Sequence, residues 1–170
     1  MTQHIFRVPV DSQHFKDTIA AGKPYTEVLP FLPAEDQLQK IAKDGRVRYW
    51  GSLPGESNKR TFKLLTAGDE LLCYRSGKYI ALATIAFPLI NPGLARSSWG
   101  ETKQKTTWEL IYFFRDVVLF TVDMRRINEA FGYKNAPVMG FSVLSDERAH
   151  TFIEAHGSLT SFIKKLKLAA

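Results

Sequence analysis

"DELLCYRSGKYIALATIAF", residues 69–87, is the stretch that decides the fold class of this chain. Two runs rich in apolar residues flank Ser76-Gly77, an arrangement that predicts a β-hairpin. Runs of the same kind recur at residues 4–10, 46–50, 107–114, 117–122 and 138–144. Because these runs are short and are separated by turn signals, we expect five to seven mostly antiparallel strands.

Helical patterns stand between and after these strands. We expect a short helix capped by Asp11 or Ser12, a helix at 33–45, one at 56–65 capped by Ser57, and helices at 123–132, 145–157 and 158–167. Residues 88–106 show little apolar periodicity, which predicts a long loop that is functional or mobile. The expected fold class is therefore α+β: a curled, mostly antiparallel β-barrel flanked by helices.

Composition restricts the class of protein further. The chain has 170 residues, and we expect residues 1–166 to form a single domain, because "KLAA" at 167–170 resembles the start of a vector-derived tail. The one cysteine excludes a disulfide framework within the chain. The sequence contains no signal-peptide pattern and no apolar stretch of membrane-spanning length. We therefore expect a cytoplasmic protein without a membrane partner.

The charge of the chain is basic, with a net charge of +6 and a pI of about 9.5. Lysine and arginine gather in short clusters, among them Lys43, Arg46 and Arg48; Lys59, Arg60 and Lys63; and Lys103 and Lys105. Such clusters favour a polyanion, nucleic acid first of all. A solvated surface on a mildly basic protein explains the same pattern equally well.

Residues for metal or nucleophile chemistry are poorly represented. The four histidines show no paired ligand spacing, and the His-x-Glu and cysteine-pair signature of zinc deaminases is missing. The sequence also has no G-x-x-x-x-G-K phosphate loop. We therefore expect no metal, no cofactor and no catalysis by this domain.

Three tryptophans remain as candidates for a binding site. Trp50 is expected to end a strand beside a Gly51-Ser52 turn, and Trp99 to lie in the long polar loop, whereas Trp108 begins a strand and is better explained as a core residue. Two facing indole rings can sandwich a planar base, and the backbone of Gly51 and Ser52 could approach the base edge. The alternative is that the rings plug the open end of a barrel.

The order of these segments resembles that of YTH-domain readers of methylated adenine. The resemblance lies in "YWGSLPGESNKRTFKLL", "GDELLCYRSGKYIALATI", "SSWGETKQKTTWELIYFFRDV" and "NAPVMGFSVLSDE", in that order. It implies a PUA-like fold of the YTH/EVE type. Related YTH-like and EVE modules stand at the N-terminus of McrBC-type restriction proteins, where they recognise modified DNA by base flipping while a separate GTPase motor and nuclease act.

The resemblance also implies roles for individual residues. Trp50 and Trp99 match the two cage tryptophans, and Trp108 is the candidate for the third wall. Base-edge contacts are expected from Asp11, Ser12, Gly51 and Ser52. Separately from the resemblance, phosphate contacts are expected from Arg48, Asn58, Lys59, Arg60, Lys63, Lys103 and Lys105. The sequence "MGFS" stands where the family has an Arg-Asp pair that touches phosphate.

The leading functional prediction is a non-catalytic domain that binds methylated double-stranded DNA by flipping the modified base into an aromatic cage, methyladenine before methylcytosine. Its expected context is a modification-dependent restriction system with a GTPase and nuclease assembly. The first alternative is a reader of methylated RNA. The second is an enzyme of the PUA-like fold that acts on a small or nucleoside substrate, which would need an acid–base pair in the pocket.

Overall fold

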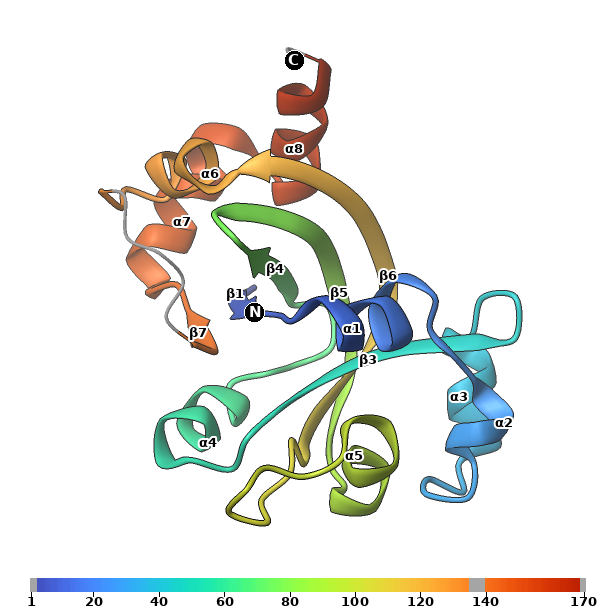
Figure 1. Ribbon diagram of the computed structural model, residues 1–170. Helices are drawn as coiled ribbons and strands as arrows, with labels where there is room; N and C mark the ends of the chain where they lie inside the picture. Colours follow the sequence, from blue (N-terminus) through green and yellow to red (C-terminus); the bar gives the residue numbers. More distant parts are fainter. Residues whose placement is uncertain (1–2, 135–139, 169–170) are drawn as a thin grey trace.

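The computed structural model describes residues 3–134 and 140–168 (Figure 1). Its strands are β1 (Ile5–Pro9), β2 (Lys23–Pro24), β3 (Arg46–Ser52), β4 (Glu70–Arg75), β5 (Lys78–Ile90), β6 (Leu110–Asp123) and β7 (Ser142–Val143). They form one sheet in the order β2-β3-β6-β5-β4-β1-β7. Only β1 and β4 pair in parallel among these strands; the other pairs are antiparallel. The sheet is curled but not closed, so the expected α+β class is confirmed, with an open sheet in place of a barrel.

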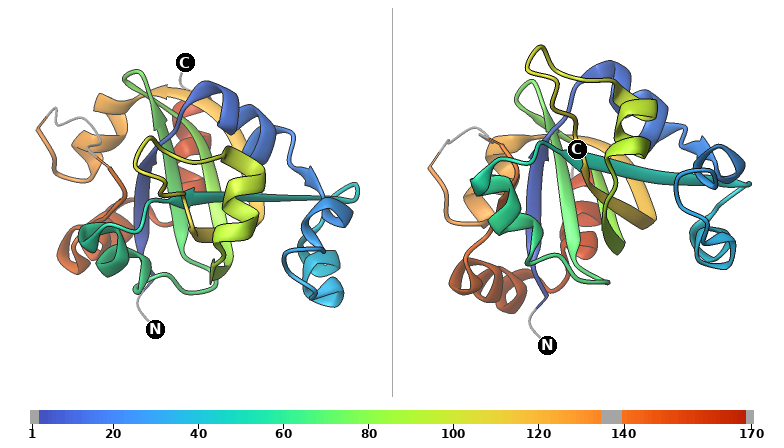
Figure 2. Two further views of the ribbon diagram at one scale, coloured as in Figure 1. Left: turned by 60° about the horizontal axis from the view of Figure 1, so that its bottom comes forward. Right: turned by 90° about the horizontal axis from the view of Figure 1, so that it is seen from below.

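Helices cover the curl from several sides. They are α1 (Ser12–Phe15), which continues as a π-helical turn at Lys16–Ala20, α2 (Tyr25–Val28), α3 (Glu35–Ile41), α4 (Glu56–Phe62), α5 (Pro92–Trp99), α6 (Met124–Ala130), α7 (Asp146–His156) and α8 (Leu159–Leu168). Helices α6, α7 and α8 gather beyond one end of the curl, while α4 and α5 lie at the opposite end (Figures 1 and 2). None of the described helices is long and apolar enough to cross a membrane.

The predicted hairpin is confirmed and is the centre of the sheet. Ser76 and Gly77 both adopt positive φ angles, 48° and 79°, as a tight two-residue turn between twisted strands requires. Beyond the turn, β5 pairs with β6 along nearly its whole length, and the register shifts at three points. Irregularities of this kind bend a strand and increase its twist, which accounts for the curl.

Strand β6 runs unbroken where two strands were expected, at 107–114 and 117–122. Its first five residues are buried on both faces, the next five are mostly exposed, and Phe120 and Val122 are buried again. The polar Arg115-Asp116 pair resembles a turn in the sequence but lies within the ladder, where Asp116 pairs with Thr84. The strand therefore passes from one core to another.

Two apolar cores result. The first fills the curl and includes Val8, Trp50, Leu71 and Phe113. The second lies under α6, α7 and α8 and includes Phe131 and Phe152. The first part of β6 is thus buried in the first core, and its last part is buried in the second.

Several predicted boundaries were wrong. The helix at 56–65 begins after Gly55 without a side-chain cap, so Ser57 does not cap it. Asp11 and Asp123 do cap their helices, through bonds from the amides of His14 and Arg125. The last expected strand, 138–144, is a strand only at Ser142–Val143 in its described part, and residues 138–139 lie outside the described residues. Helix α8 includes residues 167 and 168 of the expected tail, and residues 169–170 lie outside the described part.

Candidate nucleic-acid interface

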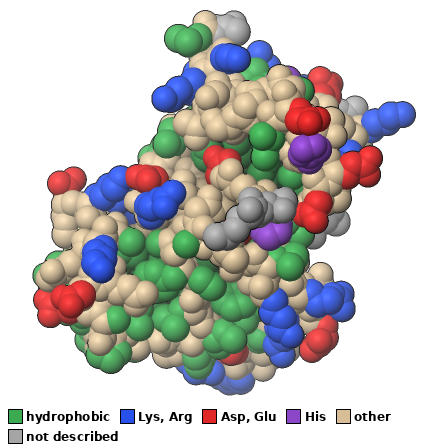
Figure 3. All heavy atoms as spheres, turned by 180° about the vertical axis from the view of Figure 1, so that it is seen from behind, with side chains coloured by type: hydrophobic (Ala, Val, Ile, Leu, Met, Phe, Trp, Pro, Cys, Tyr) green, Lys and Arg blue, Asp and Glu red, His purple; other side chains and the backbone are tan. Residues whose placement is uncertain are grey.

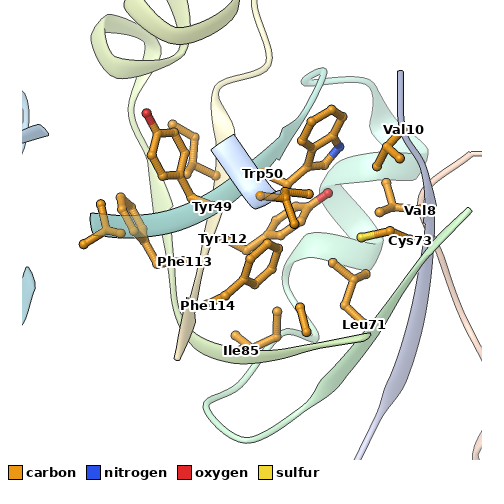
Figure 4. Close-up of a cluster of buried hydrophobic side chains, with 14 of the residues drawn as sticks. Val8, Val10, Tyr49, Trp50, Leu71, Cys73, Ile85, Tyr112, Phe113 and Phe114 are labelled. Carbon is orange, nitrogen blue, oxygen red and sulfur yellow. The ribbon is translucent and has the colours of Figure 1, made fainter. Parts of the chain in front are cut away.

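Trp50 lies within β3, not at its end. The strand continues through Gly51 and Ser52, which pair with Ile111 and Leu110 of β6, so the expected Gly51-Ser52 turn is wrong. Trp50 is 6% exposed, and its ring lies on the side of Val8 of β1 and of Val10, which follows β1 (Figure 4). The tryptophan is therefore held by the sheet itself.

Trp99 is the last residue of α5, inside the segment that was expected to be a loop. Asn91 caps this helix, Pro92 begins it, and Gly100 ends it with a φ of 76°. The helix is anchored to β3 because the Tyr49 hydroxyl lies 2.7 Å from Ser98 Oγ. Burial raises the pKa of Tyr49 to about 12, so this hydroxyl stays protonated. Trp99 was expected to lie in a polar loop, but it is only 9% exposed and belongs to the first core.

The indole rings of Trp50 and Trp99 touch. Their centroids are 5.8 Å apart and their planes are inclined by 57°, while Trp99 also lies 5.5 Å from the ring of Tyr49. A parallel slot for a base, as expected from the sequence, is therefore not open in this structure. The two rings instead form the tilted contact that aromatic pairs prefer.

Gly51 is required by this packing. A Cβ at this position would lie 2.3 Å from the backbone oxygen of Trp108 and 2.6 Å from the ring of Trp99. The open side of Gly51 is thus filled by Trp99 and Trp108, where the sequence led us to expect close approach of a base.

Five of the residues predicted for the base site nevertheless surround one small hollow. Its lining consists of Asp11, His14, Trp50, Gly51, Trp99 and Trp108. The cavity volume is about 10 Å³, room for no more than about one water molecule. The sequence therefore identified residues that meet in space, but in a closed arrangement.

A second, more open hollow of about 210 Å³ adjoins the first. The two share Asp11, Trp50, Gly51 and Trp108, and the second is completed by Val8, Pro9, Ser52, Leu53, Asn58, Gly140 and Phe141. The Ser52 hydroxyl lies 3.0 Å from that of Tyr112, whose pKa is raised by burial. Asn58 donates its side-chain amide to the Leu53 carbonyl. A planar group of moderate size would thus find aromatic walls and polar edges side by side.

Asp11 and His14 form an ion pair or hydrogen bond beside Trp108. The Asp11 carboxylate accepts from the His14 backbone amide at 2.9 Å and lies 2.8 Å from Nδ1 of its ring. The His14 ring lies 6.1 Å from that of Trp108. Sequence reasoning missed His14, although the i, i+3 spacing from a helix cap was the available signal. Ser12, expected beside Asp11, lines a separate hollow with Phe15 and Leu119.

One polar atom in this site has no partner. Among the described residues, only Trp99 Nε1 and Arg7 Nε are buried side-chain polar atoms without a hydrogen bond. A buried donor left unpaired costs about 1–3 kcal/mol. The Trp99 indole N–H could therefore gain a hydrogen bond if an acceptor came within reach.

The predicted phosphate contacts divide into two groups. Lys59, Arg60 and Lys63, on and just after α4, are exposed, as are Lys103 and Lys105 in the segment after α5. Arg48 differs, because it donates to the carbonyls of Ala20 and Ala21 and lines a different hollow with Lys43 and Arg115. On the face shown in Figure 3, lysine and arginine stand scattered around a broad hydrophobic area.

The described residues contain no group of three or more metal-ligating side chains. Cys73 is buried, and burial raises the pKa of its thiol to about 12, which makes it a poor nucleophile. The acid–base pair that the enzyme alternative would need is represented by Asp11 and His14 alone in the two hollows.

Comparison with known proteins finds a solved structure that has the same fold. No protein-family model and no curated protein matches the sequence. Among solved structures, the N-terminal domain of Thermococcus gammatolerans McrB bound to m5C DNA superimposes with a TM-score of 0.67 at 16% identity, covering 90% of this chain and 96% of that one. The Pho92 YTH domain in complex with m6A gives a TM-score of 0.48 at 15% identity, covering 95% and 92%. The chain thus has the fold of the McrB N-terminal domain, as the sequence resemblance implied.

Proposed function

We propose that this domain binds DNA that carries a methylated base and holds that base, extruded from the stack, among Trp50, Trp99 and Trp108. The observation that carries the proposal is a hollow walled by three tryptophans, one of which, Trp99, has a buried Nε1 without a hydrogen-bond partner. Its support is the shared fold with a domain that was solved bound to m5C DNA.

Binding requires the closed hollow to open. Trp99 is the ring to move, because it ends a helix at Gly100, whereas Trp50 lies inside the ladder with β6. Movement away from Gly51 would let a base take the place of the Trp99 ring over Trp50 and give Trp99 Nε1 access to an acceptor. Extrusion of a base costs a few kcal/mol, and stacking on each aromatic face contributes about 1–3 kcal/mol.

The polar groups around the hollows have separate roles in this proposal. Asp11 and the backbone at Ser52 meet the base edge, and the second hollow, with Asn58, receives the sugar and phosphate. Exposed Lys59, Arg60, Lys63, Lys103 and Lys105 hold phosphates of the flanking strand.

The finer parts of the proposal concern the mark and the context. Methyladenine is preferred to methylcytosine, because a purine offers the indole rings more area than a pyrimidine does. The domain recognises and does not catalyse. It serves as the specificity module of a modification-dependent restriction system, in which a GTPase motor and a nuclease act.

A binding panel tests this function. Duplexes of one sequence that carry methyladenine, methylcytosine, hydroxymethylcytosine or no mark, with RNA counterparts, are titrated against the parent and against Trp50→Ala and Trp99→Ala. We expect the parent to prefer methylated DNA and both variants to lose that preference while circular dichroism shows an intact fold. Equal preference in parent and variants contradicts the cage, and tighter binding of RNA would transfer the proposal to methylated RNA.

An enzyme acting on a nucleoside is the second candidate, favoured by the Asp11–His14 pair beside the tryptophans. Prolonged incubation of methylated oligonucleotides, followed by nucleoside analysis, separates the two. If the nucleosides stay unchanged, the result supports the reader. If the parent removes the methyl mark and the His14→Asn variant does not, the result supports the enzyme.

A further inference from the structure

A pocket that reads a methyl group faces a chemical ambiguity. Thymine carries the same C5-methyl group as 5-methylcytosine, and the two bases differ at C4, where cytosine has an amino donor and thymine a carbonyl acceptor. Shape and stacking alone cannot separate them. The following inference rests on the proposed function and concerns how the same hollow distinguishes amino from oxo bases.

The hollow contains a pair of acceptors with a defined orientation. Asp11 receives one bond from the backbone amide of His14 and a second from its ring Nδ1, at 2.9 and 2.8 Å. An ionised carboxylate only accepts, so Nδ1 of His14 must carry the hydrogen. In the neutral ring Nε2 is then an acceptor, and no described residue bonds to it. Each carboxylate oxygen also retains unused acceptor capacity.

Three charged side chains lie near His14, either in the hollow or on its own helix: Asp11, Lys16 and Asp17. The first hollow is completed by Trp50 and Gly51 from β3, Trp99 from α5 and Trp108 from the segment before β6. Asp11 is the one charged group among these lining residues. On the same helix, Lys16 and Asp17 follow, and Asp17 accepts from Gln13. The state of the His14 ring therefore decides whether Nε2 offers a lone pair or a hydrogen.

We propose that the Asp11–His14 pair is an amino-group filter: neutral His14 Nε2 and the Asp11 carboxylate accept from the exocyclic N–H of a flipped methylated adenine or cytosine and reject the C4 carbonyl of thymine. Protonation of His14 turns Nε2 into a donor and weakens the rejection. His14 is thus a specificity-determining residue, whose role differs from the stacking provided by the tryptophans.

The test compares methylcytosine with thymine in otherwise identical duplexes. Each base stands opposite an abasic site, so that the cost of breaking its pair is the same. Dissociation constants are measured at pH 8.0 and pH 5.5 for the parent, for His14→Asn and for His150→Asn. Asparagine can still donate to Asp11 through its amide but lacks Nε2. His150 lies on α7, where it pairs with Glu154, and serves as the matched control.

We expect the parent to prefer methylcytosine by about tenfold at pH 8.0. This factor corresponds to the loss of one hydrogen bond when the thymine carbonyl faces the acceptors in place of the amino group. The preference should fall at pH 5.5. His14→Asn should show a smaller preference that no longer changes with pH, and His150→Asn should behave as the parent. A parent-like ratio and pH response in His14→Asn overturns the filter.

A third duplex, with unmethylated cytosine opposite the abasic site, separates this inference from the proposed function. A parent that prefers methylated to plain duplex but treats methylcytosine and thymine alike overturns the filter and leaves the reader standing. A parent that ignores the methyl group overturns both.

Discussion

The two ends of the curled sheet both contain aromatic clusters, and they differ in what the rings leave unsatisfied. Under α7 and α8, Phe152 packs edge-on against Phe131 and Phe162, with centroids 5.0 and 5.3 Å apart. The His156 ring joins this cluster, 5.1 Å from Phe152, and none of its members is a buried polar side chain without a partner among the described residues. At the other end, Trp50 and Trp99 make a contact of similar distance, but Trp99 carries a buried N–H without a partner.

The comparison teaches that aromatic packing alone does not mark a site. Arg7 Nε, the other unpartnered atom, belongs to a guanidinium that stacks 4.5 Å from the Tyr133 ring and bonds to Asn128, so its group is held in place. The Trp99 indole nitrogen has no such compensation, and its ring lines the first hollow. An unpaired polar edge beside a cavity is the distinguishing feature.

Phe152→Ala should have the largest effect on stability. Its side chain is 1% exposed, and truncation of such a core ring costs about 3–5 kcal/mol. Chemical denaturation measures the loss. The ratio of methylated to plain duplex binding in the folded fraction should stay that of the parent, and a changed ratio would break the division between the two clusters.

Gly51→Ala should have the next largest effect and should act at the tryptophan end. The new Cβ would collide with the Trp108 backbone and the Trp99 ring, a strain of about 1–3 kcal/mol. Trp99 can give way by leaving its closed position. We therefore expect lower thermal stability together with stronger quenching of tryptophan fluorescence by acrylamide, because Trp99 becomes more exposed. Quenching equal to that of the parent would mean that the Trp99 ring does not move.

Arg60→Ala and Lys63→Ala sharpen the comparison through charge. If these exposed side chains hold phosphates, each substitution should lower the slope of log K against log salt by about 0.9. Lys165→Ala, near the end of α8, is the matched control and should leave the slope unchanged. Equal slopes in all three variants would move the phosphate path away from α4.

Glu70→Gln should have the smallest effect on stability. Glu70 lies at the end of the sheet that α8 covers. Desolvation raises the pKa of the Glu70 carboxyl, which a bond from Thr160 of α8 lowers in part. A raised folded-state pKa means that stability grows as pH falls toward the unfolded-state value and is lost as pH rises through the folded value. The glutamine variant should be more stable than the parent at pH 7, by at most about 1 kcal/mol. Thermal melts from pH 7 to pH 4 should show this difference shrinking.

Local signals accounted for much of the fold. Short runs of apolar residues located β1, β4 and β5, and the positive φ angles of Ser76 and Gly77 confirm the turn that joins β4 and β5. The prediction of two strands in place of β6 was wrong because the polar Arg115-Asp116 pair resembles a turn. In the structure, this part of β6 is exposed to solvent and links the parts of the strand that lie in the two cores. Long-range burial, which no local pattern encodes, overrode the local polarity.

The residues around the first hollow were predicted to lie close together, but their arrangement was not predicted. Asn91-Pro92 and Gly100 were start and stop signals for α5, yet the polar residues between them concealed the helix that carries Trp99. The tilt of the two indole rings depends on how closely α5 approaches Gly51, a tertiary distance that a sequence does not contain.

The outer strands of the sheet also determine how this domain can meet its neighbours. Strand β2 and strand β7 are each two residues long, and β2 ends in Pro24, which has no amide hydrogen to offer. An extended segment of another chain would find only two residues of β2 or of β7 to pair with, so strand addition at these two outer strands is disfavoured. Neighbouring proteins should therefore meet this domain through side chains and not through the backbone of β2 or β7.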